Sequence, residues 1–158
     1  MNPPTNRCSD QGNPCAPRRK ARVVSAPTDG RPFFLGFQST EVELPELETS
    51  AYFHFVFERA HSFGYFQLLF RNRVFPGYIY ALDTFFSPSG RYFAANWTGP
   101  YYDAFKPTFV VIDLLEWRWV ESNVFIAKNA DEQGINGEDI GGNISSINFL
   151  RQSAWNAA

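Results

Sequence analysis

The chain has 158 residues and a formal net charge of −2 at neutral pH, and 28 of its residues (18%) are aromatic. It is long enough to form one domain with its own core. This many aromatic side chains exclude a wholly disordered protein, and the abundance of phenylalanine beside a single methionine argues against a helical bundle. No apolar run approaches the roughly 20 residues that a membrane-spanning helix needs, so we expect no membrane partner.

Residues 1–30 are expected to form a flexible tail, because they contain five prolines and no sustained hydrophobic periodicity. The chain has six basic and two acidic residues up to Arg31, and eight basic and fourteen acidic residues after it. An acidic body repels phosphate groups, so a protein partner with a basic surface is favoured over nucleic acid. We expect a single β-rich domain over residues 31–152 and a short C-terminal tail over 153–158.

Cys8 and Cys15 are the only cysteines, and both lie in the expected tail. They would form a disulfide in an oxidising compartment and stay reduced in the cytosol. The polar N-terminal sequence lacks the apolar core of a secretory signal, which predicts a cytoplasmic protein unless a signal has been removed. Together with His54 and His61, the cysteines do not have the spacing of a zinc site. We therefore predict no metal and no other cofactor.

The expected strands begin directly after the tail. Residues 33–37 are the first candidate, and residues 41–44 alternate acidic with apolar side chains before Pro45 ends the pattern. Residues 51–58 place three phenylalanines on one face, as a strand with one buried face does. Residues 63–70 follow after a short turn and complete an antiparallel hairpin.

An acidic strip accompanies the first of these strands and consists of Glu41, Glu43, Glu46 and Glu48. One interpretation is a solvated edge that discourages aggregation between sheets. The other is a docking surface for a basic partner. The sequence leaves both open.

The remaining pattern is again that of strands. Residues 108–113 have an unbroken β-branched core, which predicts a strand buried on both faces. Residues 129–143 are acidic and rich in glycine and are predicted to be a long loop. Further strands are expected at 78–86, 91–97, 117–120, 124–126 and 144–150, with 145–155 also compatible with a helix. The whole is predicted to be an antiparallel meander of seven or eight strands, folded into a sandwich or a small open barrel.

One segment resembles the inner hairpin of a β-propeller blade. Residues 86–97, FSPSGRYFAANW, contain a Ser-Pro-x-Gly-Arg turn before a strand of small residues, and a second strand at 109–114 contains Asp113 near its end. The resemblance covers residues 86–114 and implies a stable meander and a scaffold for protein interactions, without any catalytic residue. No second copy of the turn motif occurs, so we do not expect a closed propeller.

The sequence contains no nucleophile elbow, HExxH, Walker A or Rossmann glycine pattern. The most suggestive features are aromatic and acidic, because tryptophan and tyrosine suit a protein hot spot or a sugar-stacking platform as well as a core. We predict a non-enzymatic protein-binding module of the inhibitor or antitoxin type. The alternatives are a β-sandwich that binds a carbohydrate or small ligand and a small hydrolase that uses His54 or His61. The candidate binding residues are Trp97, Tyr101, Tyr102, Asp103, Trp117, Trp119, Glu138 and Asp139.

Overall fold

The computed structural model describes residues 20–59, 63–99, 108–122, 125–139, 141–151 and 155–157. These residues form fourteen β-strands and two short 3₁₀ turns, with no α-helix among them, which confirms the all-β prediction. The strands belong to two open sheets, one of eleven strands and one of three. Within the described ranges, no helix has the length and apolar character needed to cross a membrane.

The large sheet is antiparallel except at one edge, where β1 pairs in parallel with β2. Its central path runs through β1 (Arg22–Ser25), β2 (Thr40–Leu44), β3 (Thr49–Arg59), β4 (Phe63–Phe70), β6 (Ile79–Tyr80), β8 (Tyr92–Trp97), β9 (Thr108–Asp113), β10 (Arg118–Ser122) and β14 (Asn156–Ala157), while β5 (Arg73–Val74) pairs with β4 and β7 (Phe85–Phe86) with β8. The small sheet contains β11 (Phe125–Ala130), β12 (Gly134–Asp139) and β13 (Ile144–Asn148), and the two 3₁₀ turns are η1 (Pro45–Leu47) and η2 (Phe149–Arg151).

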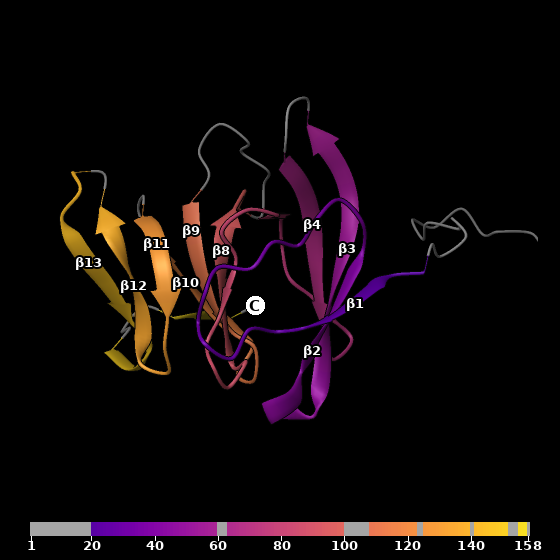
Figure 1. Cartoon of the computed structure of the whole chain (residues 1–158), viewed down its shortest axis with the longest axis horizontal. Coiled ribbons are helices and arrows are strands. Elements are labelled where there is room, and N and C mark those ends of the chain that lie inside the picture. Colours follow the sequence, from indigo (N-terminus) through magenta and orange to yellow (C-terminus); the bar gives the residue numbers. More distant parts are fainter. Residues whose placement is uncertain are drawn as a thin grey trace, which may run out of the picture.

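The strands lie in three layers, which Figure 1 shows from one side, with β11–β13 on the left, β8–β10 in the middle and β2–β4 on the right. One apolar cluster fills the space between β2–β4 and β8–β10, and a second cluster joins β8–β10 to the small sheet. Residues 108–113 are therefore buried on both faces, as the sequence predicts. Val110 and Ile112 belong to the first cluster, and Phe109 and Val111 to the second.

The hairpin predicted over residues 51–70 is formed by β3 and β4 and extends slightly further than expected. Phe53 pairs with Leu68, and both side chains are fully buried in the first cluster. A register shift between Phe55 and Phe57 places a bulge near the end of the hairpin. Phe55 pairs with Phe66, whereas Phe57 pairs with Tyr65 and stacks on its ring. Phe57 therefore lies on the other face of β3 from Phe53 and Phe55, and the prediction of three phenylalanines on one face is wrong for Phe57.

The prediction of a long loop over residues 129–143 is wrong, because β12 lies in the middle of this segment and pairs with both β11 and β13. Gly134 and Gly137 of β12 explain why this glycine-rich segment forms a strand between two others. An added Cβ would overlap the backbone oxygen of Ile147 at the first position and that of Ile126 at the second. The glycines therefore permit a close approach of the three strands, although glycines in such a polar segment ordinarily indicate turns.

Four other boundaries differ from the sequence-based expectation. β14 pairs with β10 within residues 153–158, the segment expected to be a C-terminal tail. β1 lies within the segment expected to be a tail, where Val23 and Val24 pair with β2. Residues 33–37 form no strand, and Phe33 makes an isolated bridge to Thr84 instead. The single strand expected at 78–86 is two short strands, because the chain turns between them with Asp83 at φ 52°. Residues 145–155 are also compatible with a helix by sequence, but residues 145–151 belong to β13 and η2, and residues 152–154 lie outside the described residues.

Candidate interaction surface

The tryptophans predicted to bind a partner are brought together, but around a core residue. The ring centroids of Trp97, Trp117 and Trp119 lie 5.5, 6.1 and 5.6 Å from that of Phe75. Trp97 is fully buried, and its indole N–H donates a hydrogen bond of 2.7 Å to the backbone oxygen of Pro76. Trp117 is 5% exposed and Trp119 is half-buried. The described tryptophans therefore offer no flat exposed strip for stacking on a sugar.

The other predicted binding residues lie elsewhere. Tyr101, Tyr102 and Asp103 lie outside the described residues. Glu138 and Asp139 are the last two residues of β12 in the small sheet, in a different layer from the tryptophans (Figure 1). Oε1 of Glu138 lies 3.9 Å from Nζ of Lys128 on β11.

Asp139 closes the turn between β12 and β13. Its carboxylate accepts hydrogen bonds from the backbone N–H and the side-chain amide of Asn143, at 2.9 and 3.0–3.2 Å. These bonds favour the charged form, and the side-chain bond from Asn143 contributes most to the lowered pKa of Asp139. This residue therefore has a defined structural role in the turn.

Replacing Asn143 with alanine is expected to raise the pKa of Asp139 towards the ordinary value of an aspartate, about 3.9. The pKa of Asp139 is lower in the folded state than in the unfolded state. The bonds to its carboxylate therefore stabilise the folded protein above the unfolded-state pKa, and this stabilisation is lost as the pH falls through the folded-state pKa. A titration of the side-chain carboxyl carbon by NMR measures this shift in the wild type and in Asn143→Ala. An unchanged pKa in the variant would show that the Asn143 amide does not hold the carboxylate.

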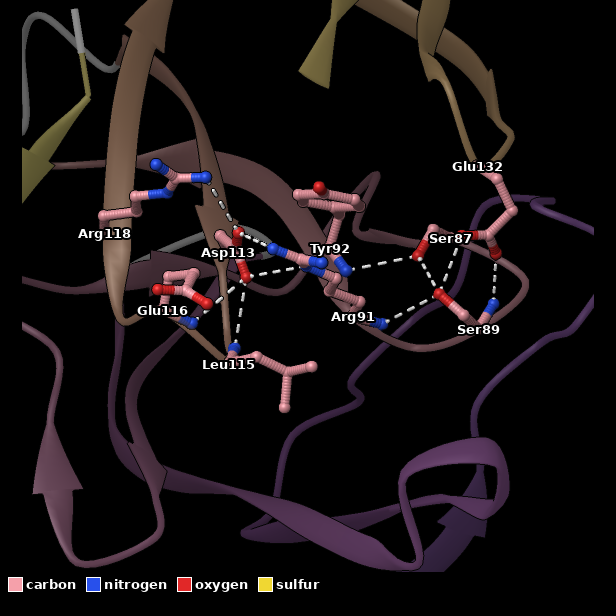
Figure 2. A network of polar contacts seen from close by, with 9 residues as sticks. All are labelled: Ser87, Ser89, Arg91, Tyr92, Asp113, Leu115, Glu116, Arg118 and Glu132. Atoms are coloured by element: carbon pink, nitrogen blue, oxygen red, sulfur yellow. Dashed lines mark hydrogen bonds and ion pairs between the residues drawn. The ribbon is translucent and has the colours of Figure 1, made fainter. Parts of the chain in front are cut away.

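A buried carboxylate organises the turns at one end of β8, β9 and β10 (Figure 2). Asp113 is completely buried and accepts two hydrogen bonds from Arg91, at 3.1 and 2.8 Å, and a longer one from Arg118, at 3.4 Å. It also accepts the backbone N–H groups of Leu115 and Glu116, both at 3.2 Å. The bond to Asp113 raises the pKa of the Arg91 guanidinium further, so this arginine stays charged.

Glu132 links this region to the small sheet. Its carboxylate accepts the hydroxyl of Ser89 at 2.8 Å and also the backbone N–H of Ser89, as Figure 2 shows. Ser89 lies in the turn before β8, and Glu132 lies in the turn between β11 and β12. Aromatic rings pack beside the arginines, with Arg118 4.7 Å from the ring of Trp155. The network therefore joins the two sheets: Arg91 and Arg118 pair with Asp113, and Glu132 binds Ser89.

The outer face of the first five strands presents a row of side chains aligned by the strand register. Val23 pairs with Glu41, Glu41 with Tyr52, Tyr52 with Leu69, and Leu69 with Val74. Val23 and Val74, at the two ends, are 55% and 51% exposed, and the three residues between them are half-buried. This row, which we name the outer row, crosses five strands and therefore about 19 Å.

The acidic strip meets the outer row at β2, because Glu41 belongs to both. Glu41 and Glu43 share one face of β2, and Glu46 and Glu48 follow in and after η1, where both are exposed. Glu43 accepts the hydroxyl of Ser25 at 3.1 Å. Within the described part of the chain, none of the four carboxylates forms an ion pair. The sequence predicts this acidic strip, but it does not reveal the outer row, whose residues come from five strands.

His54, one of the two hydrolase candidates, lies beside the outer row. Its Nδ1 is 3.4 Å from Oγ of Ser39, and its ring stacks on Tyr52. The Ser39 oxygen also accepts the backbone N–H of Phe55 at 3.0 Å. No carboxylate of the described residues hydrogen-bonds to His54, so it lacks the orienting partner of a catalytic triad there. His61 lies outside the described residues.

Metal-ligand clusters and pockets are two further kinds of site. In the described ranges, no group of three or more histidine, cysteine or acidic residues is placed to hold a metal ion, and Cys8 and Cys15 fall outside these ranges. An open pocket of about 550 Å³ lies along residues 25–34. Its charged residues, Asp29 and Arg31, are both exposed and pair with each other at 3.5 Å.

Comparison of the chain with protein families, curated proteins and solved structures finds no match.

Proposed function

We propose that this chain is a non-enzymatic protein-binding module that binds a partner with a basic surface through the outer face of β1–β5. The observation that carries the proposal is the outer row of exposed and half-buried side chains beside an acidic strip that forms no ion pair with any described residue. An inhibitor or antitoxin of a basic protein is the type of module that fits these features.

The two parts of this surface have different roles in the proposal. Val23, Tyr52 and Val74 offer apolar and aromatic area that loses water on binding, which supplies affinity. The carboxylates of the acidic strip attract a basic surface, speed the encounter and fix its orientation. Together they combine apolar contact area with charged groups, as protein interfaces do.

The two ends of the large sheet differ in how they are covered. The middle layer, β8–β10, is buried on both faces by the two apolar clusters. The β1–β5 end contributes its inner face to the first cluster, while its outer row keeps exposed side chains. Arg71 and Arg73 are exposed at the turn between β4 and β5, and β3 separates this turn from the acidic strip on β2. The basic part of the partner is therefore expected over β2.

Reversing two charges of the acidic strip is expected to weaken partner binding at least about tenfold, because attraction becomes repulsion. Glu43→Lys and Glu46→Lys are suitable, since both side chains are exposed. The wild type and the double variant are used to capture proteins from the native lysate at low and high salt. The protein retained by the wild type is then purified and its affinity for both forms is measured by calorimetry.

A matched control separates the location of the charges from the net charge. Glu116→Lys with Glu121→Lys changes the net charge equally, and both residues are exposed at the β9–β10 end. The control is expected to bind like the wild type. Equal weakening in both double variants, or unchanged affinity in Glu43→Lys with Glu46→Lys, would contradict the proposed surface. Circular dichroism establishes that all forms are folded.

A further inference from the structure

β13 is an edge strand without any of the features that usually prevent edge pairing. It pairs with β12 and with no other described strand, and it lies at the outer end of the small sheet (Figure 1). Residues 141–150, GGNISSINFL, contain no charged residue and no proline. The register of β13 with β12 is continuous, without a bulge. Natural edge strands commonly carry a lysine, a proline or a bulge, or are very short.

The other edges of the two sheets do have such features. β11, at the opposite edge of the small sheet, contains Lys128 and a register shift between Ala127 and Asn129. β5 and β14 are only two residues long, and β1 begins with Arg22. Among the described strands, β13 is thus the edge that combines five residues of regular pairing with complete neutrality.

The backbone of β13 presents hydrogen-bonding groups away from β12. The N–H of Asp139 bonds to the carbonyl of Asn143, and the N–H of Phe149 bonds to that of Gln133. Pairing in an antiparallel ladder alternates, so Ser145 and Ile147 direct their backbone groups to β12. The N–H and C=O groups of Ile144 and Ser146 therefore point outward.

The side chains beside this edge are also exposed. Ile144 is 94% exposed, which is unusual for a large apolar residue in a strand, whereas Ile147 on the opposite face is 8% exposed. Ser146 is exposed and uncharged. The edge therefore combines backbone groups of Ile144 and Ser146 that bond to no described strand with an apolar side chain that gains from being covered.

We propose that β13 pairs in antiparallel orientation with β13 of a second copy of this chain, which joins two small sheets into one sheet of six strands. An antiparallel pair of identical strands is related by a two-fold axis, the commonest symmetry of protein dimers. With the axis at Ser145, Ile144 of each copy faces Ser146 of the other, and the outward backbone groups of these two residues pair. The neutral strand opposes no like charges in this arrangement, and it offers no charge for selecting a different partner.

The dimer is expected to be weak. A ladder of five residues buries less area than the roughly 1,600 Å² of a standard interface, so dissociation in the micromolar to millimolar range is expected. The weight-average mass should therefore rise towards that of a dimer as the concentration increases. The site lies in a different sheet from the acidic strip, so this proposal does not depend on the proposed function.

Analytical ultracentrifugation of the whole chain from about 10 μM to 1 mM tests the pairing. Ser146→Pro removes the outward N–H and leaves the ladder to β12 in place, because proline is tolerated where its nitrogen faces away from the neighbouring strand. Ser146→Ala keeps this N–H and is the matched control. Ile144→Lys adds a charge to the edge, and Ile126→Lys adds the same charge to the same row of the small sheet, on β11.

The wild type, Ser146→Ala and Ile126→Lys are expected to dimerise alike, and Ser146→Pro and Ile144→Lys to weaken dimerisation at least about tenfold. Circular dichroism checks the fold of each variant, and Ile144→Lys tests the edge independently if the proline variant does not fold. A wild type that remains monomeric at 1 mM would overturn the proposal and leave the edge to a strand of another protein. A dimer that persists in folded Ser146→Pro and Ile144→Lys, or that is lost in Ile126→Lys, would also overturn it.

Discussion

Replacing Trp97 with alanine is expected to lower the free energy of unfolding by about 4 kcal/mol, because it removes a large buried ring and leaves a cavity. The side chain is fully buried and packs beside Phe75 and Trp119. The substitution also leaves the backbone oxygen of Pro76 without its indole donor. Urea unfolding followed by circular dichroism measures the change.

An exposed aromatic residue gives the control for this prediction. Phe37 is 50% exposed and packs edge-to-face on Phe34, so Phe37→Ala is expected to cost less than about 1 kcal/mol. If Trp97→Ala were as stable as Phe37→Ala, the placement of Trp97 in the core would be contradicted. A Trp97→Ala variant that keeps its stability but no longer binds the partner would instead favour the predicted role of Trp97 as a binding residue.

Replacing Asp113 with alanine is expected to destabilise the protein by about 3 kcal/mol. The substitution removes a completely buried carboxylate that accepts bonds from Arg91, Arg118 and two backbone N–H groups. Removing one partner of such a network leaves the others with unpaired groups. The arginines are 35% and 39% exposed, so water compensates them in part and the loss lies at the lower end of the usual range.

A double-mutant cycle isolates the contribution of the ion pair. Asp113→Ala with Arg91→Ala is expected to cost less than the sum of the two single variants, since the same bonds are lost in each. Glu116→Ala, an exposed acid in the same turn, is expected to cost less than about 0.5 kcal/mol. Additive losses in the cycle would show that Arg91 and Asp113 do not act together.

The parts of the fold that depend on local pattern were predictable from the sequence. The alternation of phenylalanines over residues 51–58 identified β3, and the β-branched run over 108–113 identified a strand buried on both faces. Alternation indicates one buried face and an unbroken apolar run indicates two. The bulge that turns Phe57 to the other face of β3 depends on the pairing with β4, and the alternation does not predict it.

The parts of the fold that depend on contacts distant in sequence could not be predicted from the sequence. β1 is a strand because β2 offers a parallel partner, which nothing within residues 22–25 reveals. β12 contains two glycines that normally indicate turns, and here they allow close strand packing. Both errors arose because the partner strand, rather than the local sequence, decides the structure.

The candidate surface was predictable to a similar degree. The acidic strip is visible in the sequence because its carboxylates follow one another closely, whereas the outer row joins residues from five strands through their register. Trp97 was selected for its residue type, which suits a core and an interface equally. Its burial follows from the packing of β8 against β2–β4, and the sequence does not contain that information directly.

Zero-length carbodiimide cross-linking of the captured partner to this chain, followed by mass spectrometry, tests the central claim most directly. The reagent joins carboxylates to lysine amines that are in contact, so it reports which acids face the partner. We predict cross-links from Glu41, Glu43, Glu46 or Glu48 to lysines of the partner. Cross-links confined to Glu138 and Asp139 or to Glu116 and Glu121 would contradict the proposed surface.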